Sequence, residues 1–212
     1  MSNIRGIVTV ADIKFVALSE HDFQSCIDVA QKLCKTMIDR RNLHSRDVME
    51  KFNNILMGEV AEMMVIRWLH DNGKYAVSAV DKNSGQADLG HDIYLKEKNT
   101  GVDIRCSVKS SLSYKLPPQQ ILQYSKLAST RGEMTEVNIQ VYFWLVLNPD
   151  RGANRVTTPS INNAAIFSWF GSKDIKPTEY SRYETEEREA PNTTLQNGRK
   201  MDTLLDFIED IE

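Results

Sequence analysis

The sequence predicts an α/β domain in which helices flank a mixed central sheet of about five strands. The chain has 212 residues and a mass of 24.2 kDa, which suits one domain with a sizeable core. Segments with a helical spacing of apolar residues alternate with short strand-like runs, as in α/β and α+β proteins. Apolar residues make up 41% of the chain, so a wholly disordered chain is excluded.

The first third of the chain carries two long helical patterns. Residues 4–16 alternate loosely in polarity and predict a strand or an extended arm. Ser19 is typical of a helix N-cap and Asp22 follows three residues later, so we expect a helix over 20–41. A second helical pattern predicts a helix over 45–70.

Strand-like runs and one further helix make up the middle of the chain. Two of the runs are separated by the turn-rich Asn99-Thr100-Gly101 and predict a β-hairpin. Pro117-Pro118 opens a third helix, and the strand-like run after that helix is the most apolar in the chain. The expected strands cover residues 75–80, 92–96, 102–110, 137–147 and 164–170.

Charge divides the chain near residue 177. The chain holds 26 Lys and Arg against 29 Asp and Glu, a net charge of -3. Residues 178–212 hold ten of the acids and four of the bases, which leaves a net charge of +3 on residues 1–177. We therefore expect a domain over 1–177 and an acidic C-terminal appendage over 178–212. The appendage is expected to be partly helical over 201–212 and to cover a basic surface or mediate self-association.

Cysteine usage and apolar runs bear on the compartment. The three cysteines form no CxxC pair and have no clustered histidines nearby, which favours a reducing, cytoplasmic environment without disulfides or structural zinc. The purely apolar stretches stay under ten residues, so we expect no membrane-spanning helix. The first residues lack the charged and apolar regions of a secretory signal, and none is expected.

A basic run lies between residues 96 and 131. It holds seven bases and two acids, Glu97 and Asp103, so its net charge is +5. Such a run is usually a solvated face. The same charges can also follow a phosphate backbone, which makes the chemistry around the run decisive.

The second expected helix contains an unusual pair of carboxylates. Steps of three and four residues along one face give a stripe that is apolar except for Glu59 and Glu62. Buried carboxylates need a cation, a proton or hydrogen-bond donors, because an isolated desolvated ion is costly. Gly58, directly before them, would let a ligand or another backbone approach. In the alternative, the helix turns so that Leu56 and Val60 face the core and both glutamates face water.

The expected hairpin brings a third carboxylate toward a lysine. With the turn centred on Asn99-Thr100, the numbers of facing residues sum to about 199 to 201, so Asp92 faces Ser107 to Lys109. Strand alternation puts Ser107 and Lys109 on the face opposite Val108. A plain cross-strand ion pair is one explanation. The glycines that lead into Asp92 instead favour a site that a ligand or metal enters.

Three short segments now carry an acid on a helix, an acid at one strand end and a lysine at the neighbouring strand end. They are Gly58-Glu59-Val60-Ala61-Glu62, Gly90-His91-Asp92-Ile93 and Cys106-Ser107-Val108-Lys109-Ser110-Ser111. Together they resemble the PD-(D/E)xK nuclease superfamily, the fold of many type II restriction endonucleases and resolvases. The resemblance spans residues 45–147 in the order helix, hairpin, helix, strand, and it implies a restriction-endonuclease-like core.

The resemblance implies a role for each residue that matches the family pattern. Glu59 takes the role of the helix acid, with Glu62 as its alternate, and Asp92 that of the first strand acid. These acids would bind Mg²⁺ or Mn²⁺, and Lys109 would orient or activate the attacking water. The second acid of the family falls at Ser107, and a hydroxyl is a weak neutral ligand for a hard cation.

Three outcomes stay open at Ser107. The missing carboxylate can come from Glu62 or Asp88, or the site can work with fewer acidic ligands. Alternatively, the protein is a nuclease fold that has lost cleavage and kept binding.

The function implied by the resemblance is that of a divalent-metal-dependent endodeoxyribonuclease. Its expected substrate is double-stranded DNA, and a homodimer is expected because restriction-type enzymes pair two subunits to cut both strands. One alternative is a catalytically impaired nuclease-fold DNA-binding or regulatory protein. Another is an unrelated interaction protein in which Asp92 and Lys109 form a plain ion pair. The candidate DNA-binding residues are Arg105, Lys115, Gln119, Gln120, Lys126 and Arg131.

Overall fold

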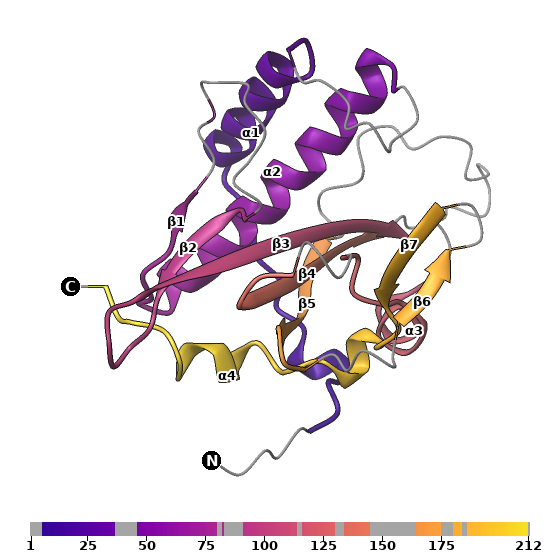
Figure 1. The fold of residues 1–212 in the computed structure, drawn as a ribbon. Helices are drawn as coiled ribbons and strands as arrows, with labels where there is room; N and C mark the ends of the chain where they lie inside the picture. Colours follow the sequence, from indigo (N-terminus) through magenta and orange to yellow (C-terminus); the bar gives the residue numbers. More distant parts are fainter. Residues whose placement is uncertain are drawn as a thin grey trace.

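The fold was analysed in a computed structural model of the whole chain. The structure describes residues 6–36, 46–79, 82, 91–113, 116–129, 134–144, 164–174, 180–183 and 186–211. Two long helices lie beside a twisted sheet, and the C-terminal segment runs back along it (Figure 1).

The sheet is mixed and has five strands in the order β1-β2-β3-β4-β5. Only β3 and β4 pair in parallel, and the other neighbours are antiparallel. The expected mixed sheet of about five strands is therefore confirmed. The strands are β1 (Val77–Ser78), β2 (Ile93–Lys96), β3 (Asp103–Ser113), β4 (Val137–Trp144) and β5 (Ala164–Gly171).

The β2–β3 hairpin has the register that the sequence predicts. Ile93 lies opposite Cys106 and Lys96 lies opposite Asp103, which corresponds to a sum of 199. The turn contains Gly101 with a φ of 65°, a left-handed conformation that glycine adopts without strain. This turn fixes which residues of the two strands face each other.

The helix α1 (Glu20–Leu33) begins as predicted and ends early. The Ser19 hydroxyl accepts a hydrogen bond from the Asp22 amide, and the Asp22 carboxylate accepts one from the Ser19 amide. The helix was expected to continue to residue 41, but residues 34–36 form a turn, so this part of the prediction is wrong. After Leu33 both the amide and the hydroxyl of Thr36 bond to the Leu33 carbonyl, which tightens the chain into a turn. The remainder of that expectation, from residue 37, lies outside the described residues.

The helix α2 (Val48–Asp71) is the longest in the structure. Asp47 caps it by accepting the amide of Glu50, so the regular helix begins three residues later than expected. The third predicted helix is α3 (Pro118–Tyr124), which has proline in its first turn.

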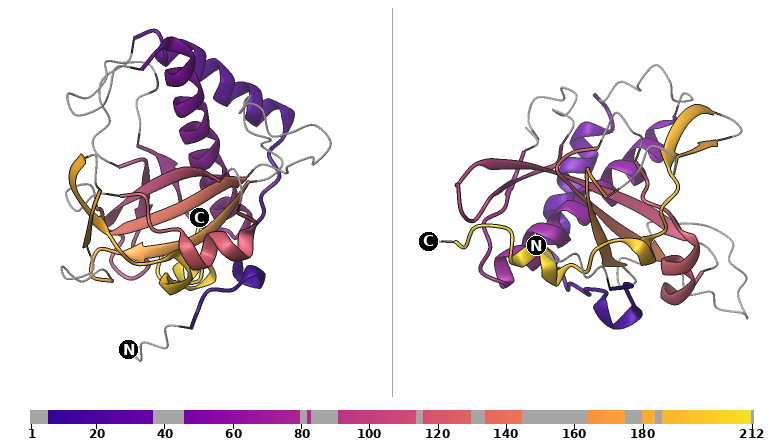
Figure 2. Two further views of the ribbon diagram at one scale, coloured as in Figure 1. Left: turned by 90° about the vertical axis from the view of Figure 1, so that its right-hand side faces the viewer. Right: turned by 60° about the horizontal axis from the view of Figure 1, so that its bottom comes forward.

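The two faces of the sheet carry different layers. The helices α1 and α2 lie together on one side of the sheet, and α3 lies on the other side (Figure 2). Ile93, Cys106 and Val141 pack with α2 in the larger core. Phe167 and Phe170 belong to a second cluster that includes the apolar residues of α3. The site predicted from the sequence therefore draws on α2, β2 and β3.

The C-terminal segment packs into the domain. Leu195, Met201, Leu204 and Ile208 are fully buried, although the acidic composition predicted an appendage. Its short elements are the antiparallel pair β6 (Tyr180–Tyr183) and β7 (Glu186–Pro191) and the helix α4 (Asp202–Leu205). The expectation of a partly helical end is confirmed, but its apolar side chains belong to the core because they alternate with the acids that face outward.

Acids of this segment pair with bases of the sheet region. Asp210 lies 2.5 Å from Lys74 and 3.5 Å from Lys98, and Glu209 lies 4.0 Å from Lys96. Two bases of the basic run are therefore paired with the C-terminal segment.

The N-terminal segment is an extended arm. It contains one short helical turn over Val10–Asp12, and Lys14 pairs with Ile166 at the edge of β5. Among the described residues, no helix is long and apolar enough to cross a membrane.

Candidate functional site

Glu59 and Glu62 of α2 are both buried, with 7% and 4% of their surface exposed. The alternative in which they face water is therefore wrong. Leu56, Val60 and Met64 are buried as well, so α2 is enclosed on more than one side. The stripe that the sequence singled out does bury two carboxylates.

The cation beside these carboxylates is Lys82. Its Nζ donates to Glu59 Oε2 at 2.6 Å and lies 3.3 Å from Glu62 Oε1. The second contact is an ion pair without hydrogen-bond alignment, because Glu62 Oε1 accepts no hydrogen bond from the described residues. Sequence reasoning missed Lys82, and its signal was indirect: a buried carboxylate pair requires a cation from elsewhere in the fold.

Burial and charge act against each other in this cluster. Burial raises the pKa of Glu62 above its ordinary value, and the ammonium of Lys82 offsets only part of that effect. Burial lowers the pKa of Lys82, but Glu62 and Glu59 outweigh it and hold that pKa above its ordinary value. On α1, burial first and then the charge of Glu59 raise the pKa of Cys26 to about 12, so this thiol stays protonated.

The α2 carboxylates lie at the end of the sheet where β2 begins. The Ser78 hydroxyl of β1 bonds to Glu62, and Ser78 pairs with Ile93. Burial raises the pKa of Cys106, and the charges of Asp92 and Glu62 both add to that shift. The two acids therefore approach the same core residue.

Asp92 ends the pairing of β2 with β3. Its Oδ2 accepts the Val108 amide at 2.6 Å and the Ser107 hydroxyl at 3.2 Å. A carboxylate that accepts a strand amide lies near the plane of the sheet. The prediction that Asp92 faces Ser107 is confirmed, and the contact is a hydrogen bond to serine and backbone.

Ser107 and Lys109 lie on the face of β3 away from α2. Cys106 and Val108 pack in the α2-side core, so the residues that alternate with them point the other way, as predicted. Ser107 is buried, and Lys109 is half-buried opposite Gln140 of β4. Lys109 therefore lies two residues beyond the Asp92–Ser107 contact, on the same face as Ser107.

The structure places four of the predicted site residues as two pairs at one end of the sheet, whereas Lys109 lies on the face of β3 away from α2 and its carboxylates. Glu59 and Glu62 share Lys82, and Asp92 bonds to Ser107. Within the described ranges, no three His, Cys, Asp or Glu residues form a group that could hold a metal ion. Asp88, the other candidate for the missing acid, lies outside those ranges.

The Glu59–Glu62 pair supplies two carboxylates, the type of ligand that Mg²⁺ and Mn²⁺ take. Mg²⁺ keeps several waters and usually binds through one or two carboxylates, so a third protein acid is not required. Glu62 Oε1 is buried and accepts no hydrogen bond from the described residues, and the Lys82 ammonium lies 3.3 Å from it, so its coordination is incomplete.

The predicted DNA-binding residues have different environments. Arg105 forms a bidentate pair with Glu136, at 2.6 Å and 3.0 Å, on the exposed surface. Gln119 and Gln120 are exposed on α3, and Lys126 is half-buried just after that helix. Lys115 and Arg131 lie outside the described residues.

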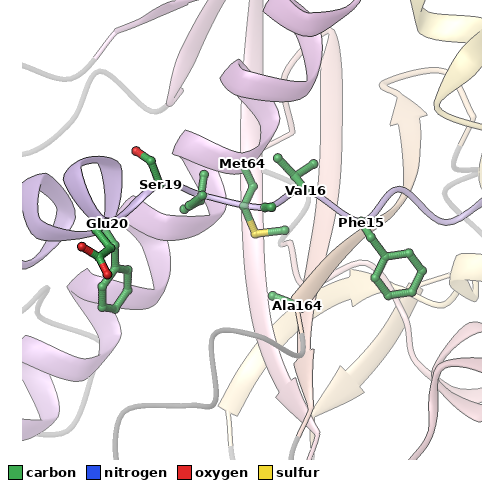
Figure 3. A pocket seen from close by; sticks show the side chains of 9 residues that line it. Phe15, Val16, Ser19, Glu20, Met64 and Ala164 are labelled. Carbon is green, nitrogen blue, oxygen red and sulfur yellow. The ribbon is translucent and has the colours of Figure 1, made fainter.

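A separate cavity of about 600 Å³ lies beside the N-terminal arm (Figure 3). Phe15 and Val16 of the arm, Met64 of α2 and Ala164 of β5 line it, together with Ser19 and Glu20 at the start of α1. Its lining contains none of the residues that the sequence predicted for the site.

Comparisons of the chain with protein-family models, with curated proteins and with solved structures find no match.

Proposed function

We propose that this protein is a divalent-metal-dependent endodeoxyribonuclease of the restriction-endonuclease-like type. One observation carries the proposal: the buried carboxylates of α2 lie at the end of the sheet where Asp92 directly precedes β2 and bonds to β3. The order α2, β2–β3 hairpin, α3 and β4 along the chain supports it, because the resemblance to the family spans a helix, a hairpin, a helix and a strand in that order.

The chain supplies hard oxygen ligands and one ammonium group for this reaction. Glu59 and Glu62 would hold Mg²⁺ or Mn²⁺, with Asp92 as the strand acid. When bound, such a cation would lower the pKa of a coordinated water and would neutralise charge on the scissile phosphate. Lys109 would stabilise the negative charge that develops in the transition state. Ser107 would orient the Asp92 carboxylate through the hydrogen bond that it donates.

The proposed substrate is double-stranded DNA. Lys126, Gln119 and Gln120 are accessible in part or in full on and after α3, where they can contact phosphates and base edges. Arg105 would have to exchange its partner Glu136 for a phosphate. A homodimer belongs to the proposal, because two subunits are needed to cut both strands at one site.

The second candidate is a nuclease-fold DNA-binding or regulatory protein without turnover. Two contacts favour it. Lys82 already neutralises much of the α2 carboxylate charge, and a serine stands where the family has its second acid. Such a protein would bind DNA through the basic residues and leave the phosphodiester bond intact.

A cleavage assay with purified protein separates these functions. Plasmid, linear duplex and single strands are incubated with Mg²⁺, Mn²⁺ or EDTA, using wild type, Glu59→Gln and the exposed β3 variant Asp103→Asn as a matched control. Cutting that requires metal, persists in Asp103→Asn and is lost in Glu59→Gln supports the nuclease. A salt-sensitive gel shift without cutting supports the binding protein. Absence of both contradicts the two candidates and favours an interaction protein.

A further inference from the structure

Lys82 lies where a cation bound by Glu59 and Glu62 would lie. Its single ammonium group contacts both carboxylates, at 2.6 Å and 3.3 Å. We propose that Lys82 is a built-in competitor for the divalent cation: it neutralises the two carboxylates in the metal-free protein and leaves them when the metal binds. This inference deepens the proposed function and rests on it for the identity of the cation.

The ammonium of Lys82 offsets the charge of both carboxylates but is hydrogen-bonded to Glu59 and not to Glu62 Oε1. Lys82 donates a short hydrogen bond to Glu59, whereas Glu62 Oε1 is buried and accepts no hydrogen bond from the described residues. Nearly all buried polar atoms in folded proteins have a hydrogen-bond partner, whereas this oxygen has the Lys82 ammonium at 3.3 Å, without hydrogen-bond alignment. A metal ion that coordinates both carboxylates would satisfy this oxygen.

Lys82 is the most exposed of the three side chains in the cluster. The Lys82 side chain is 27% exposed, against 9% for Glu59 and 5% for Glu62. The carboxylates are held on the helix α2, whereas Lys82 follows β1 in the chain and is partly exposed. Because a lysine stem has four rotatable bonds, the ammonium can return to water while the carboxylates stay in position.

Charge makes the two cations mutually exclusive. The two carboxylates carry two negative charges, which one divalent cation balances. A divalent cation and an ammonium together would leave an excess positive charge within a few ångströms, in a region where burial weakens screening. Metal binding is therefore expected to displace Lys82.

The test measures Mn²⁺ binding by the electron paramagnetic resonance signal of free Mn²⁺. Lys82→Gln is expected to bind Mn²⁺ on the order of tenfold more tightly than wild type, because the competing charge is gone. Lys82→Arg keeps that charge and is expected to bind like wild type. The matched control is Lys74→Gln, which removes a buried lysine from a different acid pair. An unchanged affinity in Lys82→Gln, or an equal gain in Lys74→Gln, overturns the proposal.

Two further measurements keep the result decisive. Glu62→Gln in the Lys82→Gln background is expected to abolish the gained affinity, and a gain that persists overturns the proposal. If Lys82→Gln unfolds easily, its thermal unfolding midpoint is measured with and without Mn²⁺. The increase on adding Mn²⁺ is expected to exceed that of wild type, and equal increases overturn the proposal.

Plasmid cleavage separates this inference from the proposed function. If Lys82→Gln binds Mn²⁺ tightly but neither wild type nor Lys82→Gln cuts plasmid, competition between Lys82 and the cation is supported and the proposed nuclease function is contradicted. Metal-dependent cutting by wild type with no affinity change in Lys82→Gln supports the nuclease and overturns the competition.

Discussion

The carboxylate of Asp92 accepts the backbone amide of Val108 at 2.6 Å. This bond stands where pairing between β2 and β3 ends, since Ile93 and Cys106 are the last paired residues at that end. Asp92 therefore has a structural role whatever its chemistry. An experiment on Asp92 must separate the two roles.

Replacement of Asp92 by alanine is expected to destabilise the protein. Without the carboxylate, the Val108 amide loses its acceptor, which costs about 1–3 kcal/mol in the free energy of unfolding. Asp92→Asn keeps a side-chain oxygen as acceptor and is expected to cost about 1 kcal/mol or less. Urea denaturation measures both. Under the proposed function both variants lose cleavage, whereas an Asp92→Ala protein as stable as wild type would contradict the structural role.

Lys109→Ala is expected to abolish plasmid cleavage in Mg²⁺ and to leave folding intact. Lys109 is half-buried near the end of β2, so removing its ammonium does not open the main core. Circular dichroism and urea denaturation serve as the folding controls. Lys51→Ala is the matched variant, because it removes one half-buried lysine that lies outside the proposed site and the basic run. Undiminished cleavage by Lys109→Ala would remove Lys109 from the site.

Ser107→Asp is expected to raise the affinity for Mg²⁺ or Mn²⁺. Ser107 is buried and its hydroxyl lies 3.2 Å from Asp92 Oδ2, so the new carboxylate would lie beside an existing one. Two adjacent carboxylates repel each other without a cation, and the variant is therefore expected to be less stable than wild type in EDTA. Isothermal calorimetry measures the affinity and thermal unfolding the stability. Equal metal affinity in Ser107→Asp and wild type would mean that this position is not a ligand.

Local signals predicted the strand pairing well. The Asn99-Thr100-Gly101 turn fixed the register, and strand alternation then assigned Cys106 and Val108 to the core face. The burial of Glu59 and Glu62 agrees with the helical spacing of the apolar residues around them. Strand alternation and helical spacing both depend on residues that are close in sequence, so both can be recognised without the fold.

Contacts between distant segments were not predictable in this way. Lys82 reaches the α2 carboxylates from 20 or more residues away, and its neighbours in sequence carry no periodic signal. The acids of the C-terminal segment suggested solvation, but Leu204 and Ile208 pack in the main core. Net charge reports the composition of a segment, whereas burial depends on the spacing of its apolar residues.

The stability of the α1–α2 contact is expected to depend on pH through Asp22. The Asp22 carboxylate accepts the Ser19 hydroxyl at 2.8 Å and the guanidinium of Arg67 of α2 at 2.6 Å. These two partners hold the pKa of Asp22 below its ordinary value. A lowered folded-state pKa stabilises the protein above the unfolded-state pKa of about 3.9, and this stabilisation is lost as the pH falls.

Asp22→Asn should therefore lower the free energy of unfolding by about 1 kcal/mol at pH 7, as expected for loss of a capping interaction. The difference between wild type and variant should shrink as the pH falls below about 4. Urea denaturation at several pH values measures it, with Asp28→Asn on the same helix as the control. A difference that stays constant between pH 7 and pH 3 would contradict the assignment to Asp22.

The C-terminal acids are expected to weaken DNA binding. Deletion of residues 178–212 is not a clean test, because Leu195, Met201 and Leu204 belong to the core. Asp210→Asn instead releases Lys98 and leaves the buried Lys74 beside a neutral side-chain oxygen. If Lys98 then contacts a phosphate, the affinity for duplex DNA rises and the slope of log affinity against log salt steepens by about one. Gel shifts across salt concentrations measure both. Asp206→Asn removes the same charge from the same segment, so an equal rise in DNA affinity in that variant would indicate an effect of net charge. An unchanged affinity and salt slope in Asp210→Asn would mean that Lys98 does not contact DNA.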